Sequence, residues 1–394
     1  MKAAIGRKLT IAGVALCCLT GCWDRIEINQ LAVVGLVGSD SNPKTHEQSI
    51  YYQIINPGSF TLQGGESSKS PVYTYKIVGQ TKGELGFKSA DILPRKLFTD
   101  QYQAHIIPES YARQGLTAFL NFYERQFNRR SSLNLFVTDS ALADVMTTYT
   151  PLERMPGRAL RSLVYNAYLS TGRISLKSRV KDLAETMESS TLSVMPIITL
   201  ISEKPNQTTK RFEMIQANPG NLALTGAALF KQGKMIGKVG LRENGYYNLI
   251  KGDIETFFES VTVEGKDVDL RASKLKVRKR LILADGMPVL QVEVKAQLAI
   301  MSNEQANKMT WSNVAQITGS FDQQVSATGQ KLFKEALDKK WDLFGLQDQI
   351  KYKHGKEWKE LQKREDAWTK TKLRLTVKST VNDVGEIINP YKGG

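Results

Sequence analysis

The residues with the clearest chemistry lie near the start of the chain, at Leu19-Thr20-Gly21-Cys22. Small residues directly before a Cys let a peptidase approach the bond, and the Cys thiol can accept a diacylglycerol. This is the pattern of a bacterial lipobox, and it predicts cleavage between Gly21 and Cys22 with lipidation of Cys22. A diacylglyceryl group supplies two acyl chains, which stable membrane anchoring usually requires.

The 21 residues before Cys22 have the layout of a secretory signal. Lys2, Arg7 and Lys8 precede an apolar run of 11 residues over positions 9–19. That run is too short to span a bilayer, which takes roughly 20 residues. We therefore expect residues 1–21 to be removed and the rest of the chain to be held at a membrane surface. The alternative is a buried Cys in a plain signal peptide, but the position, length and flanking charges all agree with the lipobox.

Cysteine usage limits the chemistry of the remaining 373 residues. Cys17 and Cys18 lie in the signal, so the predicted mature chain keeps only the lipidated Cys22. This excludes disulfides within the mature chain, thiolate metal sites and a Cys nucleophile.

Other catalytic or metal-binding patterns are also missing. The three histidines have no second His or Cys nearby in the sequence: His46, His105 and His354. No Ser lies in a nucleophile-elbow pattern, and nothing selects a carboxylate pair. We predict no metal, no cofactor and no enzymatic activity, with His105 a core or interface residue of the apolar segment Ala104-His-Ile-Ile-Pro108.

Three glycines resemble part of a phosphate-binding loop: Gly79, Gly83 and Gly86. No Gly-Lys-Ser/Thr follows them, which excludes a P-loop. We interpret them as turn glycines.

The chain is basic, with a formal net charge of +15, of which the predicted signal holds +3. Residues 22–220 carry +4 and residues 222–394 carry +8. Within the second half, four cationic residues alternate along a predicted strand: Lys274, Lys276, Arg278 and Arg280. They form either a solvated sheet face or a docking face for an acidic partner or anionic lipid. Nucleic acid is not expected to meet an exported lipoprotein.

The length of the chain predicts two or three domains. Strands and helices alternate over residues 22–201, which indicates an N-terminal mixed α/β domain. Residues 202–221 contain Glu-Lys-Pro-Asn-Gln, a Lys-Arg pair and Asn-Pro-Gly-Asn, and they are interpreted as an inter-domain connection or a long hairpin. Residues 222–394 form a predicted C-terminal α+β domain, with a possible division near residue 265 into a small middle domain and a larger terminal one.

The elements predicted for the second half are a meandering antiparallel sheet with long helices on one face. Apolar residues alternate with polar ones from Leu290 to Ile300, which is typical of a sheet with one solvated side. A helical stripe then runs from Phe321 to Leu337, and Leu373, Leu375 and Val377 mark a final strand. The predicted fold class is therefore a multi-domain α+β protein.

The mature chain resembles the Ger(x)C family, the lipoprotein C subunits of spore germinant receptors. Three segments carry this resemblance: Gly21-Cys22-Trp23-Asp24-Arg25-Ile26-Glu27-Ile28, Gly226-Ala-Ala-Leu-Phe-Lys-Gln-Gly-Lys-Met-Ile-Gly237, and Trp341-Asp342-Leu-Phe-Gly345 with Trp358-Lys-Glu-Leu361 and Trp368 after it. The family commonly has another Gly after the Phe-Gly pair, where this chain has Leu346 and Gln347.

The resemblance implies a non-enzymatic receptor subunit, required for nutrient-triggered germination, at the outer face of the spore inner membrane. Its partners would be the membrane-embedded A and B subunits. Nutrient binding is attributed mainly to the B subunit, so no germinant pocket is predicted here. The family fold is a mixed α/β body with a large curved C-terminal sheet. The alternative function is a solute-binding lipoprotein that delivers a nutrient to a transporter. Such proteins usually have two similar α/β lobes, whereas the two predicted halves of this chain differ. An exported hydrolase is the third possibility.

Overall fold

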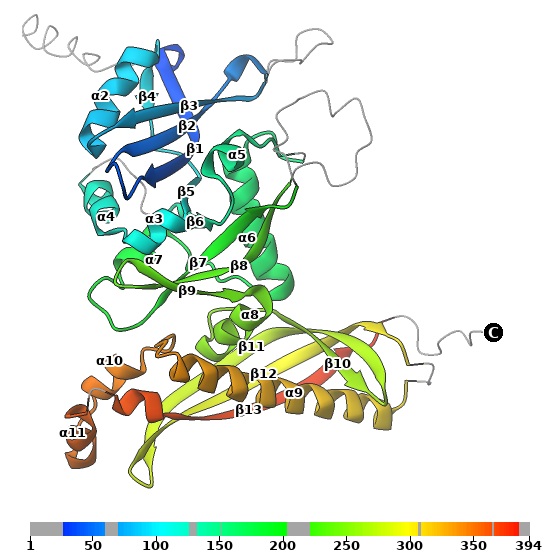
Figure 1. Ribbon diagram of the computed structural model, residues 1–394. Helices are drawn as coiled ribbons and strands as arrows, with labels where there is room; N and C mark the ends of the chain where they lie inside the picture. Colours follow the sequence, from blue (N-terminus) through cyan, green and yellow to red (C-terminus); the bar gives the residue numbers. More distant parts are fainter. Residues whose placement is uncertain are drawn as a thin grey trace, which may run out of the picture.

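The computed structural model describes residues 27–59, 70–125, 132–150, 152–202, 221–305, 309–364 and 366–385. The predicted lipidation and cleavage site, Gly21 and Cys22, lies outside these residues, as does most of the predicted connection over 202–221. The described chain forms two sheets that follow one another along the molecule, with helices packed on each (Figure 1). The predicted multi-domain α+β class is confirmed.

The first sheet has nine strands in the order β3-β2-β1-β5-β6-β7-β8-β9, with β4 beside β1. Their bounds are β1 Leu31–Ser41, β2 Gln48–Ile55, β3 Val72–Gly79, β4 Lys96–Phe98, β5 Ala104–Pro108, β6 Asn134–Thr138, β7 Ser193–Leu200, β8 Leu222–Lys231 and β9 Lys234–Gly240. The central strands β1, β5, β6 and β7 are parallel, and antiparallel strands flank them on both sides. The sheet is therefore mixed.

Helices cover both faces of this sheet. They are α2 Lys82–Ile92, α3 Glu109–Gln114, α4 Thr117–Glu124, α5 Leu142–Thr147, α6 Pro156–Thr171 and α7 Val180–Ala184. One buried cluster joins α2, α3, α4 and α7 to the sheet, and another joins α5 and α6 to its opposite face. In β5, Ile107 belongs to the first cluster and Ile106 to the second. Burial on both faces explains why these strands are continuously apolar in sequence.

The interpretation of Gly83 and Gly86 as turn glycines is wrong, because both lie inside helix α2. The helix begins after Thr81, whose side chain accepts a hydrogen bond from the Glu84 amide, while the Glu84 carboxylate accepts from the Thr81 amide. This capping box satisfies amide groups that a helix start would otherwise leave unpaired. Thr-x-x-Glu was the sequence signal for the helix.

The hairpin of β8 and β9 extends the first sheet, although the sequence placed it in the C-terminal domain. Strand β8 pairs antiparallel with β7 along most of its length. Residues 226–230 are all buried, which is typical of a strand that lies inside a sheet and is covered on both faces. The predicted start of the second domain at residue 222 therefore does not coincide with the division between the sheets.

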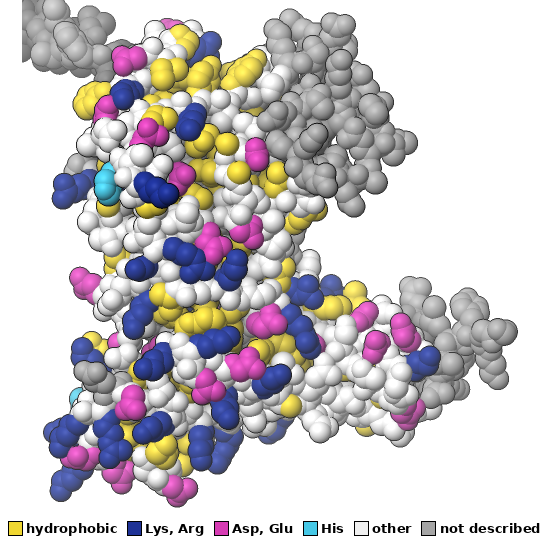
Figure 2. Space-filling model, in the orientation of Figure 1, with side chains coloured by type: hydrophobic (Ala, Val, Ile, Leu, Met, Phe, Trp, Pro, Cys, Tyr) yellow, Lys and Arg dark blue, Asp and Glu magenta, His cyan; other side chains and the backbone are white. Residues whose placement is uncertain are grey.

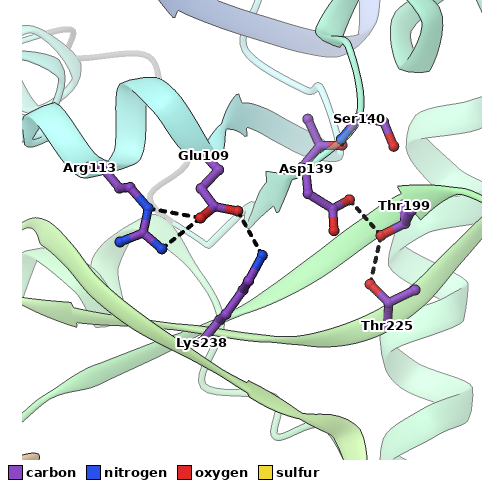
Figure 3. A network of polar contacts seen from close by, with 8 residues as sticks. Glu109, Arg113, Asp139, Ser140, Thr199, Thr225 and Lys238 are labelled. Atoms are coloured by element: carbon purple, nitrogen blue, oxygen red, sulfur yellow. Dashed lines mark hydrogen bonds and ion pairs between the residues drawn. The ribbon is translucent and has the colours of Figure 1, made fainter.

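We call the described part of residues 27–240, the first sheet with its helices, the first unit, and the described part of residues 241–385, the second sheet with its helices, the second unit. The space-filling view has the first unit above the second (Figure 2). Polar contacts tie the hairpin of β8 and β9 to the rest of the first unit (Figure 3). Lys238 of β9 lies 3.2 Å from the carboxylate of Glu109, which also pairs with Arg113 in α3. Thr199 of β7 and Thr225 of β8 share a hydrogen bond of 2.7 Å. These contacts hold the hairpin against α3 and β7.

The second sheet has the order β10-β11-β12-β13. Its strands are β10 Phe257–Val263, β11 Lys266–Ala284, β12 Met287–Asn303 and β13 Lys372–Asp383. The first three pair antiparallel as predicted, but β13 runs parallel to β12. The suggested division near residue 265 falls in the turn between β10 and β11, which belong to one sheet.

The parallel pairing follows from helix α9, Trp311–Asp338. At 1.5 Å per residue, its 28 residues return the chain over about 42 Å after β12. The next strand therefore enters the sheet in the direction of β12, as in other crossover connections. The sequence could not distinguish this arrangement from a further hairpin.

One face of the second sheet packs on α9 and on α8, Leu241–Lys251 (Figure 1). The predicted stripe of α9 is buried, including Phe321, Val325 and Leu337. Val292 and Val294 of β12 face the same core, which confirms the alternation predicted for this strand. Two short helices, α10 Leu346–Lys351 and α11 Lys356–Gln362, and the 3-10 helix η4 Ala367–Lys370 lead to β13. No helix in the described ranges is long and apolar enough to cross a membrane.

Candidate docking surface and domain joint

Cationic side chains cover the face of the second sheet that lies opposite its core. We name this surface the basic face, and its members are Lys276, Arg278 and Arg280 of β11, Lys295 of β12, and Arg374 and Lys378 of β13. All six are exposed. Their neighbours in the strands, such as Val277, Val294 and Val377, belong to the core cluster, so strand alternation directs the cations away from it.

The strand register places these residues in three rows across the sheet. Lys276 pairs with Lys295, which pairs with Lys378. The next rows are Arg278, Glu293 and Thr376, and then Arg280, Gln291 and Arg374. Neighbouring strands lie about 4.8 Å apart, so the charges fall well within one Debye length of one another.

One carboxylate lies within the basic face. Glu293 is 3.8 Å from the ammonium groups of both Lys295 and Lys378. The three arginines and Lys276 have no ion pair within the part of the chain that the structure describes. The face therefore carries a surplus of positive charge.

Lys274 does not follow the predicted alternation, because it lies in a β-bulge. Its φ is 51°, and the register moves from Ser273 opposite Gln297 to Lys276 opposite Lys295. The bulge changes the phase of the strand, since Ala272 faces the core before it and Val277 after it. Because of this change of phase, the apolar side chains of both halves of the 19-residue strand pack in one core, and Lys276, Arg278 and Arg280 are exposed.

The segment around Trp341 and Asp342 fastens the second unit to the first. A Cβ atom on Gly237 of β9 would lie 2.5 Å from the Trp341 ring, so only Gly allows this contact without movement of the ring. The Asp342 carbonyl accepts a hydrogen bond of 2.9 Å from the Leu192 amide. Two of the motifs quoted from the sequence, one ending at Gly237 and one beginning at Trp341, therefore meet in space.

The Asp342 carboxylate is buried at the start of α10. It accepts hydrogen bonds from the amides of Leu346 (2.8 Å) and Gln347 (2.9 Å). Burial raises the pKa of Asp342, although these amide bonds oppose the increase. Gly345, which precedes α10, has a left-handed φ of 65°. The position after Gly345, where this chain lacks the family's usual second Gly, is thus the capped start of a helix.

The loop after α6 makes a second set of contacts between the two units. Gly172 has a φ of 66°, and a Cβ atom there would collide with the carbonyl oxygen of Thr256. Asn244 donates a hydrogen bond of 2.7 Å to the Arg173 carbonyl, and Lys177 lies 2.7 Å from Asp253. We use the name joint for residues 172–177 and 189–192 of the first unit together with residues 244–256 and 341–348 of the second.

A buried carboxylate connects the helices of the second unit. Glu259 of β10 is 4% exposed and accepts hydrogen bonds from Arg242 (2.6 Å) and Gln324 (3.2 Å). Its hydrogen bond raises the pKa of Arg242. The contact links β10 to both α8 and α9.

The other predicted site residues are placed as follows. His105 is buried, as predicted, and its ring nitrogens lie 2.9 Å from the Ser39 hydroxyl and 3.2 Å from the Tyr102 hydroxyl. No group of three or more His, Cys, Asp or Glu side chains suited to a metal occurs within the described ranges. Sequence reasoning missed Lys295, Arg374 and Lys378, because their place beside β11 depends on how β13 pairs.

Both halves of the chain match models of spore germination proteins. Residues 24–200 match the spore germination protein N-terminal domain. Residues 225–385 match the spore germination B3/GerAC like, C-terminal domain.

Relatives and one solved structure agree with these matches. Spore germination protein KC of Bacillus subtilis (strain 168) is 23% identical over 374 residues, covering 90% of this chain and 88% of that protein. Spore germination protein B3 of the same organism is 22% identical over 394 residues, covering 96% and 98%. The crystal structure of the GerBC protein has a TM-score of 0.56 at 16% identity and covers 88% of this chain and 97% of that one, which shows a shared fold.

Proposed function

The chain belongs to the Ger(x)C family of spore germination proteins, and we propose from this that it is the lipid-anchored, non-enzymatic subunit of a spore germinant receptor. The observation that carries the proposal is the succession of two family domains over residues 24–200 and 225–385. The subunit would lie at the outer face of the spore inner membrane and act with the membrane-embedded A and B subunits. Spores that lack it should respond poorly to nutrient.

The anchor is proposed to be Cys22, within the lipobox. Cys22→Ala should abolish palmitate labelling and leave the protein uncleaved or mislocalised. Cys18→Ala is the matched control, because Cys18 lies in the predicted signal and should leave labelling unchanged. Normal labelling of the Cys22 variant would contradict the proposed anchor.

The basic face is proposed to dock on an acidic surface of a partner subunit. The three arginines and Lys276 leave a surplus of charge that an acidic surface can complement, and such charges steer association. Glu293 at the centre of the face favours a protein over a uniformly anionic membrane, since a partner can place a cation or a polar group opposite this carboxylate. Weak binding of the chain to anionic vesicles and strong binding to the A and B subunits are expected.

The test is Lys276→Glu combined with Arg278→Glu. The double variant should lose co-purification with the A and B subunits, most clearly at low salt, because exposed charges are screened within about 8 Å at physiological ionic strength. Its stability should change by less than about 0.5 kcal/mol per substitution. Lys356→Glu with Lys359→Glu makes the same charge change on exposed positions of α11 and should leave assembly intact. Normal assembly of the first variant would mean that the face is only solvated.

The alternative of a solute-binding lipoprotein has less support. Such proteins usually have two similar α/β lobes. Here a nine-stranded mixed sheet with helices on both faces is followed by a four-stranded sheet with helices on one face.

A further inference from the structure

A cavity of about 350 Å³ opens in the first unit, on the face of the sheet that α2, α3 and α4 cover. Apolar and aromatic side chains form a large part of its wall, among them Ile50, Tyr52, Leu85 and Phe119. Its volume lies near the lower end of the range for small-molecule sites, which suits a small metabolite. Phe87 lies at the cavity and is 82% exposed, an unusual position for a large aromatic side chain.

Lys82, the first residue of α2, places its ammonium group in this apolar setting. The ammonium donates a hydrogen bond of 2.8 Å to the Tyr111 hydroxyl. It also lies 5.5 Å from the centre of the Tyr111 ring and 6.0 Å from that of Phe119. No carboxylate within the described ranges forms an ion pair with Lys82. An ammonium has three N–H donors, so two of them remain for a further partner.

Several other polar groups of the cavity have contacts of their own, and one of them carries the opposite charge. His105 and Ser39 bind one another at 2.9 Å. The Asp40 carboxylate accepts a hydrogen bond from the Ser41 amide. Burial, and to a lesser extent Asp40, raises the pKa of Tyr111 to about 12, so this hydroxyl keeps its proton and can donate it. Lys82 and Tyr111 therefore present adjacent donors to the cavity.

We propose that this cavity binds a small carboxylic acid with an apolar body, whose carboxylate is held by the Lys82 ammonium and the Tyr111 hydroxyl. The apolar part lies between the rings of Tyr52 and Phe119 and the side chains of α2. A carboxylate supplies the counter-ion that Lys82 lacks, and hydrogen bonds between ionised groups are about twice as strong as neutral ones. The site is independent of the proposed docking surface, which lies on the second sheet.

The test uses calorimetry on the full chain in detergent with defined probes. Benzoate and hexanoate are expected to bind, whereas benzamide and benzylammonium should bind at least about tenfold more weakly, because a hydrogen bond to a charged group is worth about 1.5 to 3 kcal/mol. Lys82→Gln should lower the affinity for benzoate by the same factor. Lys88→Gln, on the same helix but paired with Glu84 and outside the cavity, should leave it unchanged.

The pH dependence identifies the charged group. Burial lowers the pKa of Lys82 to about 8, and only the protonated form attracts a carboxylate. Affinity for benzoate should therefore fall about 30-fold between pH 7 and pH 9.5, and this dependence should vanish in Lys82→Gln. The other titratable groups that line the cavity are Asp40, His105 and Tyr111, of which Tyr111 contacts the ammonium directly.

Several outcomes would overturn the inference. They are no binding of either acid up to tens of millimolar, equal binding of benzoate and benzamide, and a flat pH profile for the unmodified chain. Preferential binding of benzylammonium would assign recognition to Asp40 instead. Equal loss of benzoate affinity in the Lys82 and Lys88 variants would show that the effect is not specific to the cavity.

Discussion

Replacing Gly172 by Ala tests whether the joint holds the two units in one arrangement. The residue lies at the end of α6 with a φ of 66°, and its missing side chain leaves space for the Thr256 carbonyl. Alanine adds two costs there. The first is the left-handed backbone conformation, about 1 to 2 kcal/mol. The second is the collision with Thr256, which overpacking data place at about 1 to 3 kcal/mol.

Gly265 provides a matched control for the first cost. Its φ is 76°, and a Cβ atom there would meet nothing within 4 Å. Gly265→Ala should therefore lose only about 1 to 2 kcal/mol, whereas Gly172→Ala should lose about 2 to 5 kcal/mol. At about 2 to 4 °C per kcal/mol, the extra cost of about 1 to 3 kcal/mol in Gly172→Ala should separate the two melting temperatures by about 2 to 12 °C.

The assay is thermal unfolding of the body expressed from Trp23 onward, followed by circular dichroism and by Trp fluorescence. Four of the five Trp residues lie in the second unit, so the fluorescence reports mainly on that unit, whereas the dichroism reports on the whole chain. If the joint is fixed, both signals should shift together in Gly172→Ala. Equal melting temperatures for the two variants would refute the reasoning, since the Thr256 contact would then cost nothing to displace.

Three further measurements test other parts of the structure. The same body should melt within about 5 °C of its normal temperature after chelator or reductant, because neither metal nor disulfide is expected to support it; a larger drop with either would contradict this. Arg242→Met should cost about 1 to 3 kcal/mol by leaving the Glu259 carboxylate buried without its cation, whereas Arg271→Met at an exposed position should cost little. Asp342→Ala should cost about 1 to 3 kcal/mol in urea unfolding, because two amides of α10 lose their acceptor; a near-neutral result would mean that solvent replaces it.

The sequence predicted those elements whose burial has a simple period. The alternation from Leu290 to Ile300 and the stripe of α9 are both found, because each has one buried side. Helix α2 was missed because Gly83 and Gly86 suggested turns, although its capping box was present. The hairpin of β8 and β9 was placed in the second domain, and its pairing with β7 of the first sheet was not predicted, since strand pairing over long sequence distances leaves no local pattern.

The candidate surfaces were predictable to different degrees. Lys276, Arg278 and Arg280 could be grouped because they share one strand. The other half of the basic face comes from β12 and β13, and its position follows from a parallel register that only the structure shows. Lys82 and Tyr111 are separated by 28 intervening residues and meet through tertiary packing alone, so the cavity had no signal in the sequence.

The parallel pairing of β12 with β13 also determines the order in which the second unit can fold. Val289 pairs with Lys372, about 80 residues later in the chain. Contacts this far apart form slowly, because a long loop must close before any of them is made. Until β13 arrives, β12 presents an unpaired edge of N–H and C=O groups that a second chain can occupy. Protection of this edge while the chain folds is therefore a condition for obtaining monomeric protein.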